Sequence, residues 1–97
     1  MRRERERQFG RLAAFVRHLP CLVCGGYPSE AAHVRARRMW GAWLPDGAGN
    51  IVPLCHGCHA EQHRIGVISF QAVHSIDLAG AAREAGMWFN ACEGADG

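Results

Sequence analysis

The chain has 97 residues, of which 48% are hydrophobic and 21% charged, and its formal net charge is +2. This length favours a single domain, residues 1–97, with a small core, and such domains often gain stability from a metal or disulfides. No apolar run approaches the roughly 20 residues of a membrane span, and the charged N-terminus lacks the apolar stretch of a secretory signal. We therefore expect a cytoplasmic protein without membrane contact, whose paired cysteines bind metal rather than form disulfides.

The charge is unevenly distributed along the chain. Residues 1–38 contain nine arginines and three glutamates, whereas residues 39–97 contain two arginines and six acidic residues, and lysine is absent. Arginine binds phosphate groups through two parallel hydrogen bonds, so a basic N-terminal half favours a nucleic-acid partner. A genome composition that favours arginine over lysine would give the same bias, so the arginine content alone does not decide between the two.

An amphipathic helix is predicted over residues 1–19. Apolar residues at helical spacing form a face between Phe9 and Leu19, and Pro20 ends the helix. The first turns alternate arginine and glutamate, which is typical of a solvated helix end. We interpret the arginines of these turns as solvent-exposed rather than as DNA contacts.

The middle segment, residues 20–66, contains two Cys-x-x-Cys pairs. Cys21 and Cys24 form the first pair, and Cys55 and Cys58 form the second. Two such pairs can place four thiolates around one ion in a closed tetrahedral zinc site. A redox dithiol is the alternative for a single pair, but no thioredoxin-like βαβ pattern surrounds either one. The sequence therefore predicts a structural zinc site, and Cys92 is interpreted as a small buried apolar residue.

Two short strands and a helix are predicted between and after the cysteine pairs. Residues 31–34 and 51–54 are apolar and suit strands, and a loop rich in turn residues separates them. His59 and His63 follow directly at a spacing of four, which places both on one face of a helix, where two imidazoles can bind one ion. This order of elements places one histidine of the first strand, His33, near a metal-binding helix.

Two further helices are predicted over residues 67–92. Ser69 is expected to cap the first helix and Asp77 the second. Trp88 and Phe89 are assigned to the apolar side of the second helix, and the tail from Glu93 is expected to be loose.

At this point the chain resembles the HNH endonucleases, the ββα-metal group. The order of His33, Asn50 and His59 carries the resemblance, with one cysteine pair before the first and the other around the last. Three segments resemble the small HNH proteins of phages and prophages, including the Ref-like group: Leu19–Gly25, Ser29–Arg35 and Val52–His63. The resemblance covers roughly residues 9–80. It implies an α+β fold, a small zinc-stapled ββα-metal (His-Me finger) domain with flanking N- and C-terminal helices.

The resemblance also implies roles for individual residues. His33 would be the general base that activates water, and Asn50 would hold the loop between the strands and help to orient the base. His59 and His63 would bind one catalytic divalent ion (Mg²⁺, Mn²⁺, Ni²⁺ or Zn²⁺), which stabilises charge on the phosphate. Double-stranded DNA would contact four arginines: Arg35, Arg37, Arg38 and Arg64. Three histidines receive no role: His18, His56 and His74.

Each of these residues also has a simpler interpretation. Without the resemblance, His33 would be a buried core histidine and Asn50 a turn former. His63 would be an exposed helix residue, and His59 a substitute for a cysteine at the zinc. The motif and the spacing of four favour the functional interpretation in each case.

One residue departs from the family pattern. In many HNH enzymes the residue before the base is an Asp or His that binds the catalytic metal, but here it is Ala32. The ion would then be held by two histidines and water, or it would recruit Asp46, Glu61 or His33 itself. A His33 that binds the metal is not free to act as the base.

The function expected from this pattern is metal-dependent hydrolysis of DNA phosphodiester bonds, by nicking or cutting with low sequence specificity, in a bacterial host cell. The alternative from another class is a non-catalytic zinc module that binds DNA or a protein. RNA as the substrate is a third hypothesis.

Overall fold

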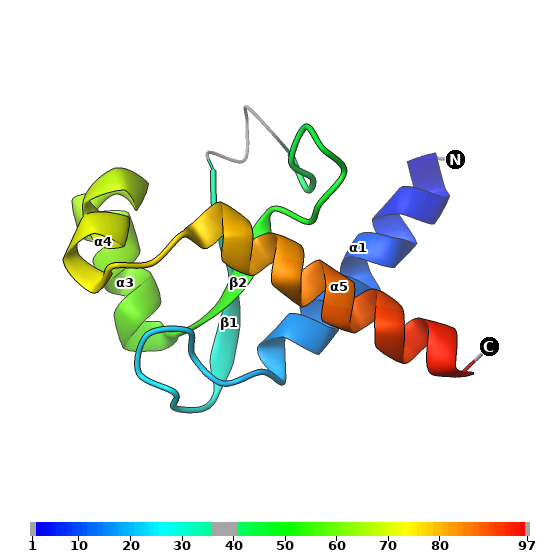
Figure 1. Cartoon of the computed structure of the whole chain (residues 1–97), viewed down its shortest axis with the longest axis horizontal. Helices are drawn as coiled ribbons and strands as arrows, with labels where there is room; N and C mark the ends of the chain where they lie inside the picture. Colours follow the sequence, from blue (N-terminus) through cyan, green and yellow to red (C-terminus); the bar gives the residue numbers. More distant parts are fainter. Residues whose placement is uncertain (1, 36–40, 97) are drawn as a thin grey trace.

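The structure is a computed structural model that describes residues 2–35 and 41–96 (Figure 1). The described residues form four α-helices and one two-stranded antiparallel sheet. In chain order the elements are α1 (Arg2–Arg17), β1 (Ser29–His33), β2 (Ile51–Cys55), α3 (His56–Ile65), α4 (Val67–His74) and α5 (Leu78–Asp96). The predicted α+β class is thus confirmed. Within the described residues, none of the helices combines the length and apolar character that crossing a bilayer requires.

Helix α1 packs against the sheet through the apolar face that its sequence predicts. Leu12, Ala13 and Val16 are buried and share a cluster with Ile51 of β2 and Phe89 of α5. The helix ends at Arg17, two residues before the predicted end. The next two amides, those of residues 18 and 19, bond carbonyls three residues back, which tightens the last turn ahead of the proline.

The two strands pair with a register that separates the core into two parts. Ala32 lies opposite Val52, and His33 lies opposite Ile51. Because side chains alternate along a strand, Ala32 and Val52 share one face of the sheet, while Ala31 and Ile51 share the other. The face with Ala32 and Val52 belongs to a core cluster that also contains buried residues of α4 and α5. The face with Ala31 and Ile51 packs against α1.

Helix α3 follows β2 without a loop, since Cys55 is both the last strand residue and the N-cap of the helix. Gly66 ends α3 with φ of 88°, a backbone conformation that favours glycine, and α4 begins at the next residue. Figure 1 shows α3 and α4 together at one end of the molecule, with α5 running across the sheet toward α1. The α3 helix is therefore fixed in direction by the strand that precedes it.

The C-terminal helices differ from their prediction in three respects. Helix α4 begins at Val67 and has no side-chain cap, so Ser69 lies inside it and is not the cap. Helix α5 begins directly after Asp77, as predicted, but it continues to Asp96, so the tail expected to be loose is helical. Phe89 is buried as predicted, whereas Trp88 is 61% exposed.

Candidate functional site

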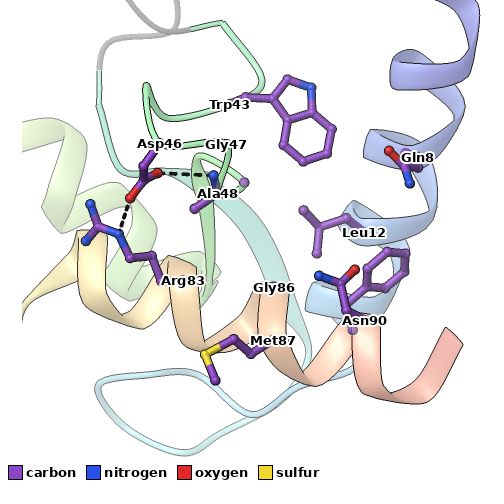
Figure 2. A pocket seen from close by; sticks show the side chains of 12 residues that line it. Gln8, Leu12, Trp43, Asp46, Gly47, Ala48, Arg83, Gly86, Met87 and Asn90 are labelled. Atoms are coloured by element: carbon purple, nitrogen blue, oxygen red, sulfur yellow. Dashed lines mark hydrogen bonds and ion pairs between the residues drawn. The ribbon is translucent and has the colours of Figure 1, made fainter. Parts of the chain in front are cut away.

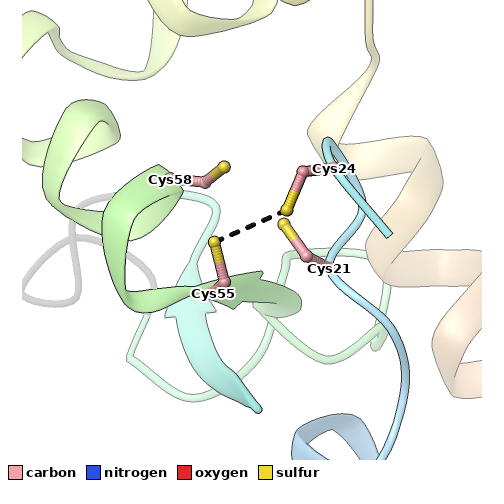
Figure 3. A group of neighbouring side chains, drawn as sticks. All are labelled: Cys21, Cys24, Cys55 and Cys58. Atoms are coloured by element: carbon pink, nitrogen blue, oxygen red, sulfur yellow. Dashed lines mark hydrogen bonds between the residues drawn. The ribbon is translucent and has the colours of Figure 1, made fainter. Parts of the chain in front are cut away.

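The side chains of Cys21, Cys24, Cys55 and Cys58 lie close together (Figure 3). All four sulfur atoms lie within 4.8 Å of one another, and the Sγ atoms of Cys24 and Cys55 are 3.7 Å apart. Four sulfurs at the usual distance from a tetrahedral zinc ion are about 3.8 Å from one another. The cluster fits a structural metal such as zinc, and within residues 2–35 and 41–96 it is the only group of three or more metal-ligating side chains with converging donor atoms.

Backbone hydrogen bonds shape the first cysteine pair into a tight turn. The Cys21 amide donates to the Gly26 carbonyl, and the Gly25 amide donates to the Cys21 carbonyl, both at 2.9 Å. Gly25 has φ of 74°, which a residue with a side chain rarely adopts. The Leu22 amide donates to the carbonyl of Pro53 at 2.9 Å, and this bond ties the turn to β2, which leads into the second pair.

The surroundings of Cys21, Cys24 and Cys58 shift the pKa values of their thiols in different directions. Burial works to raise the pKa of Cys21, but backbone amides, including those of Cys24 and Cys55, outweigh it and lower the pKa to about 6. The Gly26 amide works to lower the pKa of Cys24, but the thiols of Cys21 and Cys55 raise it on balance. Burial and then the neighbouring thiols raise the pKa of Cys58. Four crowded sulfurs therefore need the charge of a metal ion to be thiolates together.

The fifth cysteine lies outside this cluster. Cys92 is on α5 and is exposed, so its assignment as a buried apolar residue is wrong. The α5 helix turns a different set of residues toward the core: Leu78, Ala82, Ala85 and Phe89.

His59 and His63 lie side by side on α3, as their spacing predicts. Their Nε2 atoms are 3.1 Å apart and their ring centroids 4.8 Å apart. Two nitrogens each about 2.1 Å from an ion subtend about 95° there when they are this far apart. That angle lies between octahedral and tetrahedral values, so the pair fits two neighbouring positions of one divalent ion. His63 is exposed, which leaves the remaining positions of such an ion accessible to solvent.

Glu30 of β1, a residue without a predicted role, contacts His59 of this pair. Its Oε1 lies 2.7 Å from Nδ1 of His59, and its Oε2 lies 3.1 Å from Nδ1 of His56. These hydrogen bonds to His59 and His56 hold the pKa of the Glu30 carboxyl below its usual range. The available signal was strand alternation, which places Glu30 on the same face as Ala32, the face toward α3.

His33 is the last residue of β1 and is half-buried. Its carbonyl accepts a hydrogen bond from Nε2 of Gln62 on α3 at 2.9 Å. Because His33 pairs with Ile51, its side chain starts from the face opposite to that of Ala32. Its donor atoms do not join those of His59 and His63 in a group of three.

Asn50 is fully buried directly before β2. Its Oδ1 accepts the Arg35 amide at 3.0 Å, and its Nδ2 donates to the carbonyls of Arg35 and Gly41, at 3.3 and 3.1 Å. The side chain thus connects both ends of the loop between the strands. This placement agrees with a residue that holds the loop.

The arginines predicted to bind DNA are only partly described. Arg35 is exposed where β1 leads into the loop, and Arg64 is exposed on α3, with its guanidinium 4.0 Å from Glu61. Arg37 and Arg38 lie outside the described residues. Of the histidines without an assigned role, His56 contacts Glu30, and His74 contacts Glu61 through its Nε2.

A hollow of about 490 Å³ lies away from these residues, between α1, α5 and the loop before β2 (Figure 2). Asp46 stands at its edge and accepts hydrogen bonds from Arg83 and from the Ala48 amide. The Arg83 guanidinium and then this amide hold the pKa of Asp46 below its usual range. His33, Asn50, His59 and His63 do not line the hollow, and Asp46 does not join His59 and His63 in a group of converging donor atoms.

Comparison of the chain with models of known families, with curated protein sequences and with solved structures found no match. The interpretation of the site therefore depends on its geometry and on the motifs quoted above.

Proposed function

We propose that this chain is a metal-dependent HNH endonuclease that hydrolyses phosphodiester bonds of double-stranded DNA, nicking or cutting with low sequence specificity. The observation that carries the proposal is the pair of Nε2 atoms of His59 and His63, 3.1 Å apart on a helix that directly follows an antiparallel strand pair. Strand, loop, strand and metal-binding helix is the order that the ββα-metal resemblance implies.

In this proposal His59 and His63 hold one divalent ion on α3. Among the described residues no third His, Cys, Asp or Glu converges on the pair, so the ion retains positions for water and phosphate oxygens. Bound there, the ion would stabilise the charge on the phosphate and on the leaving oxygen. Ala32 is buried on the face toward α3 and provides no ligand, which leaves the ion two protein ligands.

His33 has the role of general base. We assign it as the base and not as a third metal ligand, because its donor atoms form no converging group with those of His59 and His63. Imidazole exchanges protons near neutral pH, as a base that activates water must. The Gln62 hydrogen bond to the His33 carbonyl fixes the end of β1 against the helix that holds the ion, so the two parts of the site keep a constant separation.

The DNA backbone is bound by exposed arginines on both sides of this arrangement. Arg35 extends from the end of β1 and Arg64 from α3; both are exposed, and Arg64 would exchange its contact with Glu61 for a phosphate. Asn50 holds the backbone of Arg35 through two hydrogen bonds, so it positions this contact indirectly. These contacts carry no base readout, in keeping with low sequence specificity.

Nicking of a supercoiled plasmid tests the proposal. Zinc-loaded protein with added Mg²⁺, Mn²⁺ or Ni²⁺ should convert the plasmid to open circles, and His33→Ala should slow this by at least about 100-fold. The matched control is His18→Ala, which removes an exposed histidine outside the site and should cleave like the wild type. Cleavage that persists in His33→Ala would refute the general-base role, and a wild type inactive with every ion would refute the nuclease.

A non-catalytic zinc module is the second candidate, favoured by one observation. The four-cysteine cluster alone gathers a full set of ligands within the described ranges. Metal analysis separates the candidates, because the module predicts about one zinc per chain and the nuclease predicts a second, exchangeable ion. The module would also bind DNA or protein without cleaving DNA in the plasmid assay.

A further inference from the structure

We propose that Glu30 is the positioning residue of the histidine pair: its carboxylate orients His59 so that Nε2 of this ring faces the metal. The inference rests on the proposed metal site and gives a role there to Glu30, which lies in the segment Ser29–Arg35 but is not among the residues to which the resemblance assigns a role. Glu30 acts through His59 and does not itself touch the ion.

The hydrogen bond between Glu30 and His59 selects one form of the imidazole. An ionised carboxylate only accepts hydrogen bonds, so Nδ1 of His59, 2.7 Å away, must carry the proton. The lone pair of the neutral ring is then on Nε2, which lies 3.1 Å from Nε2 of His63. A carboxylate behind a metal-binding histidine fixes the tautomer and the ring orientation, and it strengthens the ligand.

The carboxylate is itself held at two points. Its second oxygen lies 3.1 Å from Nδ1 of His56, and its backbone is fixed by pairing of β1 with β2, where Glu30 lies opposite Leu54. His59 is mostly buried, with 20% of its side chain exposed, so its ring cannot easily turn away from this partner. Strand pairing and these two contacts thus hold the Glu30 carboxylate against His59.

Glu30 is a poor candidate for a direct ligand. Both of its oxygens are engaged by imidazole nitrogens, and it does not join His59 and His63 in any group of converging donor atoms. The nearest acidic residue in sequence to the pair, Glu61, contacts His74 and Arg64 instead. Glu30 therefore provides the carboxylate that supports the pair, and Glu61 provides a matched control.

Calorimetric titration of Ni²⁺ into zinc-loaded protein tests this without reference to cleavage, since imidazole ligands suit Ni²⁺. Glu30→Ala should weaken Ni²⁺ binding by about 10- to 100-fold. Glu30→Gln should fall between this variant and the wild type, because its amide oxygen still accepts from Nδ1. Glu61→Gln removes a charge from α3, the helix that carries the histidine pair, and should bind Ni²⁺ like the wild type. Zinc content and thermal melting establish that each variant is folded.

Nitrogen NMR of the imidazole rings provides a second measurement on protein without Ni²⁺. His59 should be protonated at Nδ1 in the wild type and should shift toward the Nε2-protonated form in Glu30→Ala. Wild-type Ni²⁺ affinity and an unchanged tautomer in Glu30→Ala would overturn the positioning role. If His63→Ala loses Ni²⁺ binding in the calorimetric titration while Glu30→Ala keeps it, the metal site is supported and only the positioning role of Glu30 fails. If His63→Ala binds Ni²⁺ like the wild type, the metal site and the positioning role both fail.

Discussion

The two ends of the β1–β2 sheet are closed by different chemistry. At the end where Ser29 pairs with Cys55, four sulfur atoms gather within 4.8 Å of one another. At the other end, where His33 pairs with Ile51, Asn50 closes the loop with three hydrogen bonds to backbone atoms. The first end gathers side chains that fit a metal ion and are partly open to solvent, whereas the second is closed by a polar side chain that is completely buried.

Each end positions one half of the proposed site. The cysteine end fixes the start of α3 and with it the histidine pair, while the asparagine end fixes the stretch that carries His33 and Arg35. The Gln62 side chain connects the halves, because it extends from α3 to the carbonyl of His33. Substitutions at the cysteine end and at the asparagine end should therefore affect zinc content and stability differently.

The largest expected effect is the loss of a metal ligand at the first end. Cys58→Ser should reduce bound zinc from about one ion per chain to nearly none. The free energy of unfolding should fall by at least about 3 kcal/mol, because binding of the ion contributes directly to folding. Metal analysis and urea denaturation measure the two quantities. Ni²⁺ binding at the histidine pair should be lost as well, since α3 then lacks its anchor.

Cys92→Ser is the matched control for this variant. It also exchanges a thiol for a hydroxyl, but at an exposed position of α5, and it should keep both the zinc and the stability of the wild type. If Cys58→Ser stays as stable as Cys92→Ser, the first end is not closed by a metal.

The second expected effect is a dependence of zinc affinity on pH. The raised pKa values of Cys24 and Cys58 mean that both keep their protons at neutral pH, whereas Cys21, with its pKa of about 6, is already a thiolate. Zinc needs thiolates, so its uptake at neutral pH should release at least these two protons. Affinity should then fall at least about 100-fold for each unit by which pH decreases below neutral.

Zinc titrations in buffers with different heats of ionisation count these protons. Release of fewer than two protons would contradict the assignment of Cys24 and Cys58 as thiols in the metal-free protein. Ni²⁺ titrated into zinc-loaded protein gives the comparison at the second, two-ligand site, where no cysteine proton is displaced.

The sequence predicts the cysteine end of the sheet better than the end closed by Asn50, for a physical reason. A Cys-x-x-Cys pair is a local pattern, and the spacing of four in His59 and His63 fixes their proximity through helix geometry alone. The strands were predicted to within two residues of their observed ends because they are apolar and bounded by turn residues. These features need no knowledge of what lies across the fold.

Glu30 and the partners of Asn50 could not be found in this way. Glu30 meets His59 across 29 positions of sequence, and only the sheet register and the placement of α3 bring them together. The hydrogen bonds of Asn50 go to backbone atoms, which leave no signature in the identity of the partner residues. The length of α5 was underestimated because its last turns lack apolar periodicity.

The smallest expected effect concerns the second end alone. Asn50→Ala leaves the backbone groups that Asn50 satisfies without partners, and it should lower the free energy of unfolding by about 2 kcal/mol. Zinc content should stay that of the wild type, because the cysteine cluster lies at the opposite end of the sheet. Asn90→Ala removes the same group from an exposed position of α5 and should change neither quantity. Urea denaturation and metal analysis check both variants.

Asn50→Asp separates the hydrogen bonds from the volume of the side chain. An aspartate keeps the acceptor for the Arg35 amide but turns a second oxygen toward the carbonyls of Arg35 and Gly41, which favours its neutral form. Its pKa in the fold should therefore exceed the unfolded value, so that the stability it contributes is present at low pH and is lost as pH rises through the raised value. The deficit of Asn50→Asp relative to Asn50→Ala should grow as pH rises from about 4, the pKa of an unfolded aspartate, up to the raised value in the fold. A deficit independent of pH over this range would mean that solvent reaches position 50, and the second end would then not be closed by a buried side chain.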